Sequence, residues 1–194
     1  GLFSKKAKTT AIFAVLIFSL YLPLMLEYAM LRPSSAVAAN NWIRNNIPSG
    51  SKIVNIGPTL SLNENKNSIK DIKKHSPEFL TKRQNYMLSM DEENYPKPDY
   101  YILTPSLYRG GVPAEILNVN FDYVIMSWQY GGYDSAFSKA EYYGAKKENL
   151  VKLFPEGVTP ASFSENIEAI RQPFFNLAKV THNGPAVAIY KLVK

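Results

Sequence analysis

The chain has 194 residues, with 22 Lys and Arg against 16 Asp and Glu for a formal charge of +6, and no cysteine. The missing cysteines exclude a disulfide framework, a thiol nucleophile and cysteine-ligated zinc. Residues 1–33 carry four Lys or Arg and one Glu, so +3 of the charge lies there and +3 remains for the rest. This excess is too weak and too dispersed to favour nucleic acid as a partner.

An apolar stretch near the N-terminus is the clearest pattern in the sequence. Residues 9–26 are uncharged and follow three lysines within residues 5–8. Extended to Leu31, the stretch reaches the roughly 20 residues that a helix needs to cross a bilayer, and Glu27 is its only charged residue. More basic residues precede the stretch than follow it, which places its N-terminal flank in the cytoplasm. The pattern predicts a transmembrane helix.

This prediction defines two parts of the chain and a location. Residues 1–33 form the membrane helix with its cytoplasmic flank, and residues 34–194 form an extracytoplasmic domain of an integral protein of the cell membrane. About 160 residues are enough for one domain with its own core. The short connection predicts that this domain lies close to the bilayer. Residue 1 is glycine, which favours a fragment preceded by further spans.

Two alternatives to a membrane helix stay open. The motif Ala36-Val37-Ala38 resembles a signal-peptide cleavage site, but the apolar stretch is longer than a usual signal core and the motif lies about ten residues beyond it. A buried core helix is the other alternative, although such a helix normally has one polar face. Pro23 is compatible with a membrane helix, since these tolerate proline.

Apolar periodicity, capping residues and turn residues predict the elements of residues 34–194. Predicted helices cover residues 34–46, 76–90, 114–117, 135–143 and 161–170, and predicted strands cover 52–56, 100–103 and 123–126. Residues 61–70 are interpreted as a loop. Residues 176–194 are interpreted as two strands about a turn at Asn183-Gly184, a strong hairpin signal.

Strands that alternate with helices indicate an α/β fold. The first strands are expected to be parallel and covered on both faces, and the C-terminal β-hairpin to add antiparallel strands at one edge. The predicted fold class is therefore α/β, with one N-terminal transmembrane helix followed by a small, mostly parallel α/β sandwich and a C-terminal β-hairpin.

Four segments carry a resemblance to a known family. They are residues 39–53 (ANNWIRNNIPSGSKI), 98–103 (PDYYIL), 121–127 (FDYVIMS) and 184–192 (GPAVAIYKL). The first, directly after a membrane span, resembles the junction that follows the last span in GT-C class membrane glycosyltransferases. These are the relatives of dolichyl-phosphate-mannose protein mannosyltransferases and of the bacterial enzymes that add aminoarabinose to lipid A. The other three segments resemble the C-terminal tails of the same enzymes.

The resemblance implies a function for a parent enzyme. That enzyme would transfer a sugar from a polyprenyl-phosphate donor to a glycan, lipid or protein acceptor. In the family the catalytic carboxylates lie in the first extracytoplasmic loop, which this chain does not contain, so no catalytic residue is assigned here. We expect an accessory domain whose partners are the bilayer, the upstream transmembrane domain and the sugar substrates. No cofactor is expected in this chain, and a divalent cation in the parent enzyme stays open.

A second function class also fits the sequence. The chain could be a single-span, membrane-anchored binding or scaffold protein without catalysis. The reading frame upstream of residue 1 would discriminate the two, because many further spans and an early acidic loop favour the enzyme.

Aromatic loops after two predicted strands form the candidate ligand surface. Ligands of open α/β sheets lie beyond the carboxyl ends of the strands. The candidate binding residues are Tyr108, Arg109, Trp128, Tyr130 and Tyr133, within residues 107–111 and 127–134. Aromatic rings stack on sugars, and an arginine can bind a phosphate through two donors. The alternative is that these rings only pack the domain.

Other chemistry has weaker support. The acidic residues 91–94 lack the spacing of a calcium loop, so no metal site is predicted. The sequence contains two histidines, His75 and His182, but no serine in a motif such as Gly-x-Ser-x-Gly that would indicate a hydrolase. Its glycines form no phosphate-binding loop.

Overall fold

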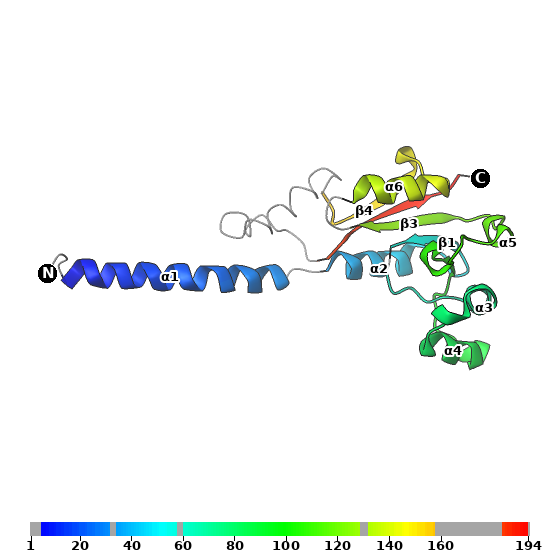
Figure 1. Ribbon diagram of the computed structural model, residues 1–194, viewed down its shortest axis with the longest axis horizontal. Coiled ribbons are helices and arrows are strands. Elements are labelled where there is room, and N and C mark those ends of the chain that lie inside the picture. The colour runs from blue at the N-terminus through cyan, green and yellow to red at the C-terminus, as the bar shows by residue number, and fades with distance from the viewer. Residues whose placement is uncertain (1–4, 32–33, 58–59, 129–131, 158–183, 194) are drawn as a thin grey trace. The chain divides into compact units, whose positions relative to one another are not determined.

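The computed structural model describes residues 5–31, 34–57, 60–128, 132–157 and 184–193 (Figure 1). The chain divides into two compact units. One contains residues 1–34 and 159–183, and the other contains residues 35–158 and 184–194. The second, which we call the α/β unit, holds the sheet and all the helices after the first one in the described residues.

The first unit contains helix α1, Lys5–Met30, which includes Pro23. A helix at this position was predicted and is confirmed. Among the residues that the structure describes, however, no helix is both long enough and apolar enough to span a membrane. The predicted transmembrane helix is therefore not supported by the described residues.

A five-stranded mixed sheet forms the centre of the α/β unit. Its strands are β1 (Lys52–Ile56), β2 (Tyr101–Leu103), β3 (Tyr123–Trp128), β4 (Leu150–Phe154) and β5 (Ala186–Lys191). Their order is β2-β1-β3-β5-β4. Strand β1 pairs in parallel with β2 and β3, whereas β5 pairs antiparallel with β3 and β4.

Helices cover both faces of this sheet. They are α2 (Ser35–Asn46), α3 (Lys66–His75), α4 (Lys82–Ser89), α5 (Ala114–Leu117) and α6 (Tyr133–Tyr142), with 3-10 turns η1 (Pro77–Phe79), η2 (Glu92–Asn94), η3 (Pro105–Leu107) and η4 (Lys147–Asn149). Figure 1 shows α2 and α6 on opposite sides of the sheet. Coverage on both faces explains why β1, β3 and β5 are almost continuously apolar in sequence.

The main core lies between α2 and the sheet. It consists of Ala39 and Ile43 from α2, of Ile47 directly after α2, and of Ile53, Leu60, Leu62, Tyr100, Ile102, Ile125, Phe154, Val187 and Ile189. Ile43, Ile53, Ile125 and Ile189 are fully buried. Each such isoleucine contributes about 1.5–3 kcal/mol of hydrophobic stabilisation. This core fixes the register of β1, β3 and β5, and therefore the position of every loop at the ends of these strands.

The mixed topology corrects part of the predicted fold. The α/β class and the strands β1, β2 and β3 are confirmed, but the sheet is mixed rather than mostly parallel. Strand β5 has β3 and β4 as its two neighbours, so it is an inner strand and not one arm of an edge hairpin. Its antiparallel partner on the outer side is β4, which the sequence did not indicate. The predicted strand within residues 176–181 and the predicted helix 161–170 lie outside the described residues.

Local capping explains two further differences between prediction and structure. Helix α3 begins within the predicted loop, because the Asn65 side chain accepts a hydrogen bond from the Ser68 amide at 2.9 Å and caps it. The predicted helix 76–90 is divided, because Thr81 and Gln84 form a capping box that starts α4.

Gly57 is the residue at which the end of β1 comes closest to β3. Its φ is +111°, and a Cβ atom there would lie 2.3 Å from Ser127 Oγ and 2.8 Å from the Ser127 carbonyl oxygen. Gly50 also has a positive φ, +85°, but a Cβ atom there would meet nothing within 4 Å. A side chain at Gly50 would meet backbone strain alone, whereas a side chain at Gly57 would meet backbone strain and steric overlap together.

We expect Gly57→Ala to lower the free energy of unfolding by about 2–4 kcal/mol, because it adds overlap with Ser127 to the cost of a positive φ. The matched control Gly50→Ala carries only the cost of a positive φ, about 1 kcal/mol. Urea unfolding of the full chain, followed by circular dichroism, measures both. Equal losses at the two positions would contradict the close approach at Gly57.

Candidate functional site

The sheet places the predicted aromatic loops at one edge. Strands β1, β2 and β3 are parallel, so their carboxyl ends meet at the same edge. Tyr108 and Arg109 follow η3 after β2, Trp128 ends β3 and Tyr133 begins α6. Tyr130 lies outside the described residues. The structure therefore shows what the other four residues contact.

Trp128 and Tyr133 belong to a row of four rings between α6 and the sheet. The Trp128 side chain is only 5% exposed, and its ring meets Tyr133 edge-on with centroids 5.2 Å apart. Tyr133 stacks on Phe137 at 5.6 Å, and Phe137 contacts Tyr190 at 5.8 Å. Burial raises the pKa of the Tyr190 hydroxyl, and a hydrogen bond with Tyr133 adds a smaller effect in the same direction. This arrangement is that of a packed aromatic core.

Tyr108 and Arg109 also have partners within the unit. Tyr108 is buried, and burial together with the nearby Asp71 and Glu64 charges raises the pKa of its hydroxyl to about 12. The Arg109 guanidinium lies 5.1 Å from the centre of the Phe79 ring. A cation over an aromatic face contributes about 0.5–1 kcal/mol at an exposed site. Of the four described candidates, only Arg109 is exposed, so these contacts favour the packing interpretation for the rings.

A polar cluster that the sequence did not indicate connects residues 63–64 to α4. Gln84 Nε2 donates to Glu64 Oε2 at 2.6 Å, and Arg83 donates to Asn63 Oδ1 at 3.2 Å. Burial raises the pKa of the Glu64 carboxyl, while the hydrogen bond from Gln84 and the charge of Arg83 act in the opposite direction. Tyr95 donates to the Glu64 carbonyl oxygen at 2.5 Å. The hydrogen bonds of Arg83 and Gln84 attach α4 to residues 63–64, so these polar groups have a structural role.

The acidic residues considered for a metal site and the histidine considered for a hydrolase contact neighbouring side chains. Glu92 pairs with Lys66 at 3.1 Å. His75 Nε2 and Lys74 Nζ both contact Glu115 Oε1, at 2.9 and 2.7 Å. The hydrogen bond from Lys74 lowers the pKa of Glu115. Within the described part of the chain no group of three or more His, Asp or Glu could hold a metal ion. His182 lies outside the described residues.

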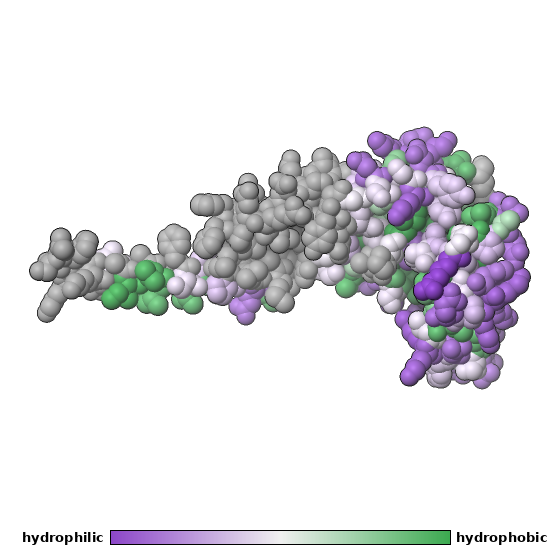
Figure 2. Space-filling view, in the orientation of Figure 1, coloured by the Kyte–Doolittle hydropathy of each residue, from purple (hydrophilic) through white to green (hydrophobic). Residues whose placement is uncertain are grey.

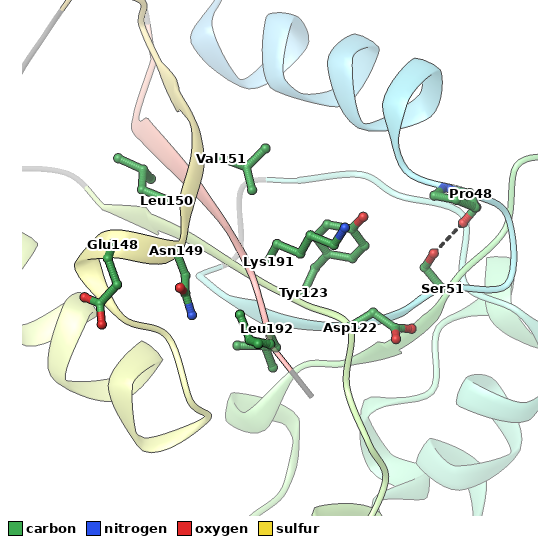
Figure 3. Close-up of a pocket in the computed structure, with 11 residues that line it drawn as sticks. Pro48, Ser51, Asp122, Tyr123, Glu148, Asn149, Leu150, Val151, Lys191 and Leu192 are labelled. Atoms are coloured by element: carbon green, nitrogen blue, oxygen red, sulfur yellow. Dashed lines mark hydrogen bonds between the residues drawn. The ribbon is translucent and has the colours of Figure 1, made fainter.

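An open groove of about 790 Å³ lies at the opposite edge of the sheet (Figure 3). This edge holds the amino ends of β1, β3 and β4 and the carboxyl end of β5. The groove is lined by Pro48, Ser51, Asp122, Tyr123, Glu148, Asn149, Leu150, Val151, Lys191, Leu192 and Val193. Its residues come from four separate segments, 48–51, 122–123, 148–151 and 191–193, so no local motif could have revealed it.

Hydrogen bonds to the backbone hold the walls of the groove. Asp122 Oδ2 accepts from the Lys52 amide at 2.9 Å, and the Asp122 carbonyl accepts from the Leu192 amide at 2.9 Å. Ser51 Oγ donates to the Pro48 carbonyl at 2.7 Å. Tyr123 on β3 is opposite Lys191 on β5 in the ladder, and Figure 3 shows the two side chains next to each other. Tyr123, Leu150, Val151 and Lys191 of the lining lie on strands, and the remaining lining residues lie in the segments next to strand ends.

Comparison with known proteins gives no match for this chain. No family model matches it, and searches of curated proteins and of solved structures find no significant similarity.

We expect Trp128→Ala to lower the free energy of unfolding by about 3–5 kcal/mol, because it empties a buried site in the aromatic row. Arg109→Ala removes an exposed contact and should cost less than about 1 kcal/mol. Urea unfolding followed by circular dichroism compares the two variants. A loss below about 1 kcal/mol for Trp128→Ala would contradict its role in packing.

Proposed function

We propose that this chain is the membrane-bound, extracytoplasmic accessory part of a GT-C class glycosyltransferase. The parent enzyme would transfer a sugar from a polyprenyl-phosphate donor to an extracytoplasmic acceptor. In this proposal α1 is seated in an apolar environment formed by lipid and by upstream membrane helices of the parent. The α/β unit covers the acceptor side of the parent's active site and contributes no catalytic residue.

The observation that carries the proposal is the exposure of apolar side chains on α1. Ile12, Phe13, Val15, Leu16, Ile17, Leu20 and Leu24 are each between 51% and 66% exposed, and green apolar atoms are visible on this helix in Figure 2. Soluble proteins rarely expose contiguous apolar surface of this kind. Full burial of an exposed leucine contributes about 1.5–3 kcal/mol, and each of these partly exposed leucines would gain a corresponding fraction on transfer to an apolar environment. The lysines before this surface support an N-terminal flank in the cytoplasm.

The sequence resemblance supports the enzymatic part of the proposal. It covers α2 and the strands β1, β2, β3 and β5. In the family, this region follows the last membrane span and is accessory to the catalytic loop. The α/β unit provides a rigid sheet with a groove at one edge, which suits an accessory domain that binds an acceptor.

A second candidate is a membrane-anchored binding or scaffold protein without catalysis. The groove of the α/β unit favours it, because a binding surface of this kind needs no upstream catalytic part. The two candidates share the role proposed for α1. They differ in whether sugar transfer depends on the chain.

The first test of the proposal concerns membrane attachment. The chain should remain with cell membranes after an alkaline carbonate wash, and a tag after Lys194 should be labelled from outside intact cells. The double variant Leu16→Lys, Leu20→Lys should be released from membranes, because a lysine at the centre of a membrane helix costs about 2.5–3.5 kcal/mol.

The matched control for this test is Val193→Lys, which places a lysine at a residue of the α/β unit that is 82% exposed. It should stay with the membranes. Release of the unmodified chain by carbonate, or labelling of the C-terminal tag only after permeabilisation, would contradict the proposed attachment.

The second test concerns sugar transfer. The purified chain should transfer no sugar from a polyprenyl-phosphate hexose. The parent enzyme without residues 34–194 should lose at least about tenfold in kcat/KM for the acceptor, as expected if the domain contributes acceptor binding in the transition state. Undiminished transfer by the shortened parent would contradict the accessory role and favour the scaffold candidate.

A further inference from the structure

A second cavity adjoins the groove. It has a volume of about 400 Å³ and is lined by Leu117, Val119, Asn120, Phe121, Tyr142, Tyr143, Gly144, Leu192 and Val193. Leu192 and Val193 line both cavities, so these residues separate two neighbouring compartments. Because the Leu192 amide is bonded to the Asp122 carbonyl, the dividing segment is fixed to the start of β3. The two compartments therefore form one extended surface, which we call the double groove.

Aromatic rings are available in both compartments. Tyr123 is half-buried, with part of its ring packed on the α2 core and its remaining surface lining the larger compartment. In the smaller compartment, the Tyr142 and Tyr143 rings meet edge-on with centroids 5.0 Å apart. Tyr142 is 72% exposed, which is unusual for so large an aromatic side chain. Such rings provide flat, apolar surfaces with a polar hydroxyl at the edge.

Hydrogen-bonding groups of both kinds line the larger compartment, which contains Tyr123. Asn149 provides amide donors and an acceptor, Glu148 provides carboxylate acceptors and Lys191 provides ammonium donors. Leu150 and Val151, each more than 40% exposed, supply apolar wall between them. The charged residues that line the two compartments are Asp122, Glu148 and Lys191, so the surface has one more negative than positive charge.

We propose that the double groove binds an uncharged oligosaccharide. A sugar ring combines an apolar face, which stacks on an aromatic ring, with hydroxyl groups that donate to carboxylates and accept from amides and ammonium groups. Two compartments with a ring in each match a chain of at least two sugar units. Saccharide binding by the double groove is independent of the proposed function, whereas the role of the double groove as the acceptor site rests on it.

The charge and shape of the double groove disfavour two other ligands. A phosphate or an anionic lipid headgroup would face an excess of negative charge. A peptide bound as an added strand would use the edge of β4 and its backbone hydrogen bonds, whereas the rings of the double groove lie on other segments. The saccharide uses the rings and the polar groups together.

The test is calorimetric titration of the full chain in lipid nanodiscs, which avoids sugar-based detergents. The probes are maltotetraose, mannotetraose and chitotetraose, each added to about 10 mM, so that a dissociation constant of about 1 mM is still detected. At least one probe should bind. Tyr142→Ala and Asn149→Ala should each weaken its affinity about 3- to 10-fold, as expected for one stacking contact or one hydrogen bond.

Tyr86→Ala is the matched control, because Tyr86 is 66% exposed on α4 and lines neither compartment. Its affinity for the probe should equal that of the unmodified chain. Absence of binding for all three probes overturns the inference, as does binding that Tyr142→Ala and Asn149→Ala leave unchanged. Binding of inorganic phosphate or tetra-alanine that is lost in these variants, without saccharide binding, also overturns it. Saccharide binding together with undiminished transfer by the shortened parent would overturn the proposed function alone.

Discussion

Strand β3 is bounded on all four sides, and the rest of the α/β unit depends on this. Its edges are paired with β1 and β5, one face packs on the α2 core and the other contacts α6. Val124, Ile125 and Met126 have no exposed surface. A shift of one residue in register would move each of these side chains to the opposite face, where its size and shape no longer fit the packing. The two ends of β3 are therefore fixed points to which the surrounding loops are attached.

The two ends of β3 have different surroundings. At the carboxyl end, the Trp128 ring is buried against Tyr133, and Gly57 lies against Ser127 with no room for a side chain. At the amino end, Asp122 accepts hydrogen bonds from the Lys52 and Leu192 amides, and the double groove lies beside these contacts. Because β5 is antiparallel to β3, the carboxyl end of β5 lies at this open edge. The rule that ligands lie beyond the carboxyl ends of strands therefore points to both edges of a mixed sheet, and sequence reasoning applied it only to the parallel strands.

Much of the fold could be predicted because local signals and tertiary packing agree in most segments. The strands β1 and β3 are apolar runs of the length and composition of buried strands, and α5 covers the predicted residues 114–117. Prediction failed where the local signal was weak. Helix α3 has only Ile69 and Ile72 facing the core among ten mostly polar residues, and β4 contains Lys152 at its centre. Both elements are stabilised by contacts with distant segments, which a single sequence does not show.

The candidate site shows the same limit more strongly. A pattern of aromatic residues in a loop indicates that rings are present, but it does not distinguish a ring that packs from one that binds. Trp128 and Tyr142 are equally aromatic in sequence, yet one is 5% exposed and the other 72%. The difference arises because Trp128 ends a strand whose faces are both covered, whereas Tyr142 ends a helix beside a cavity. Function in this unit is therefore expected where the packing of β3 stops, since rings and polar groups remain available together to a ligand there.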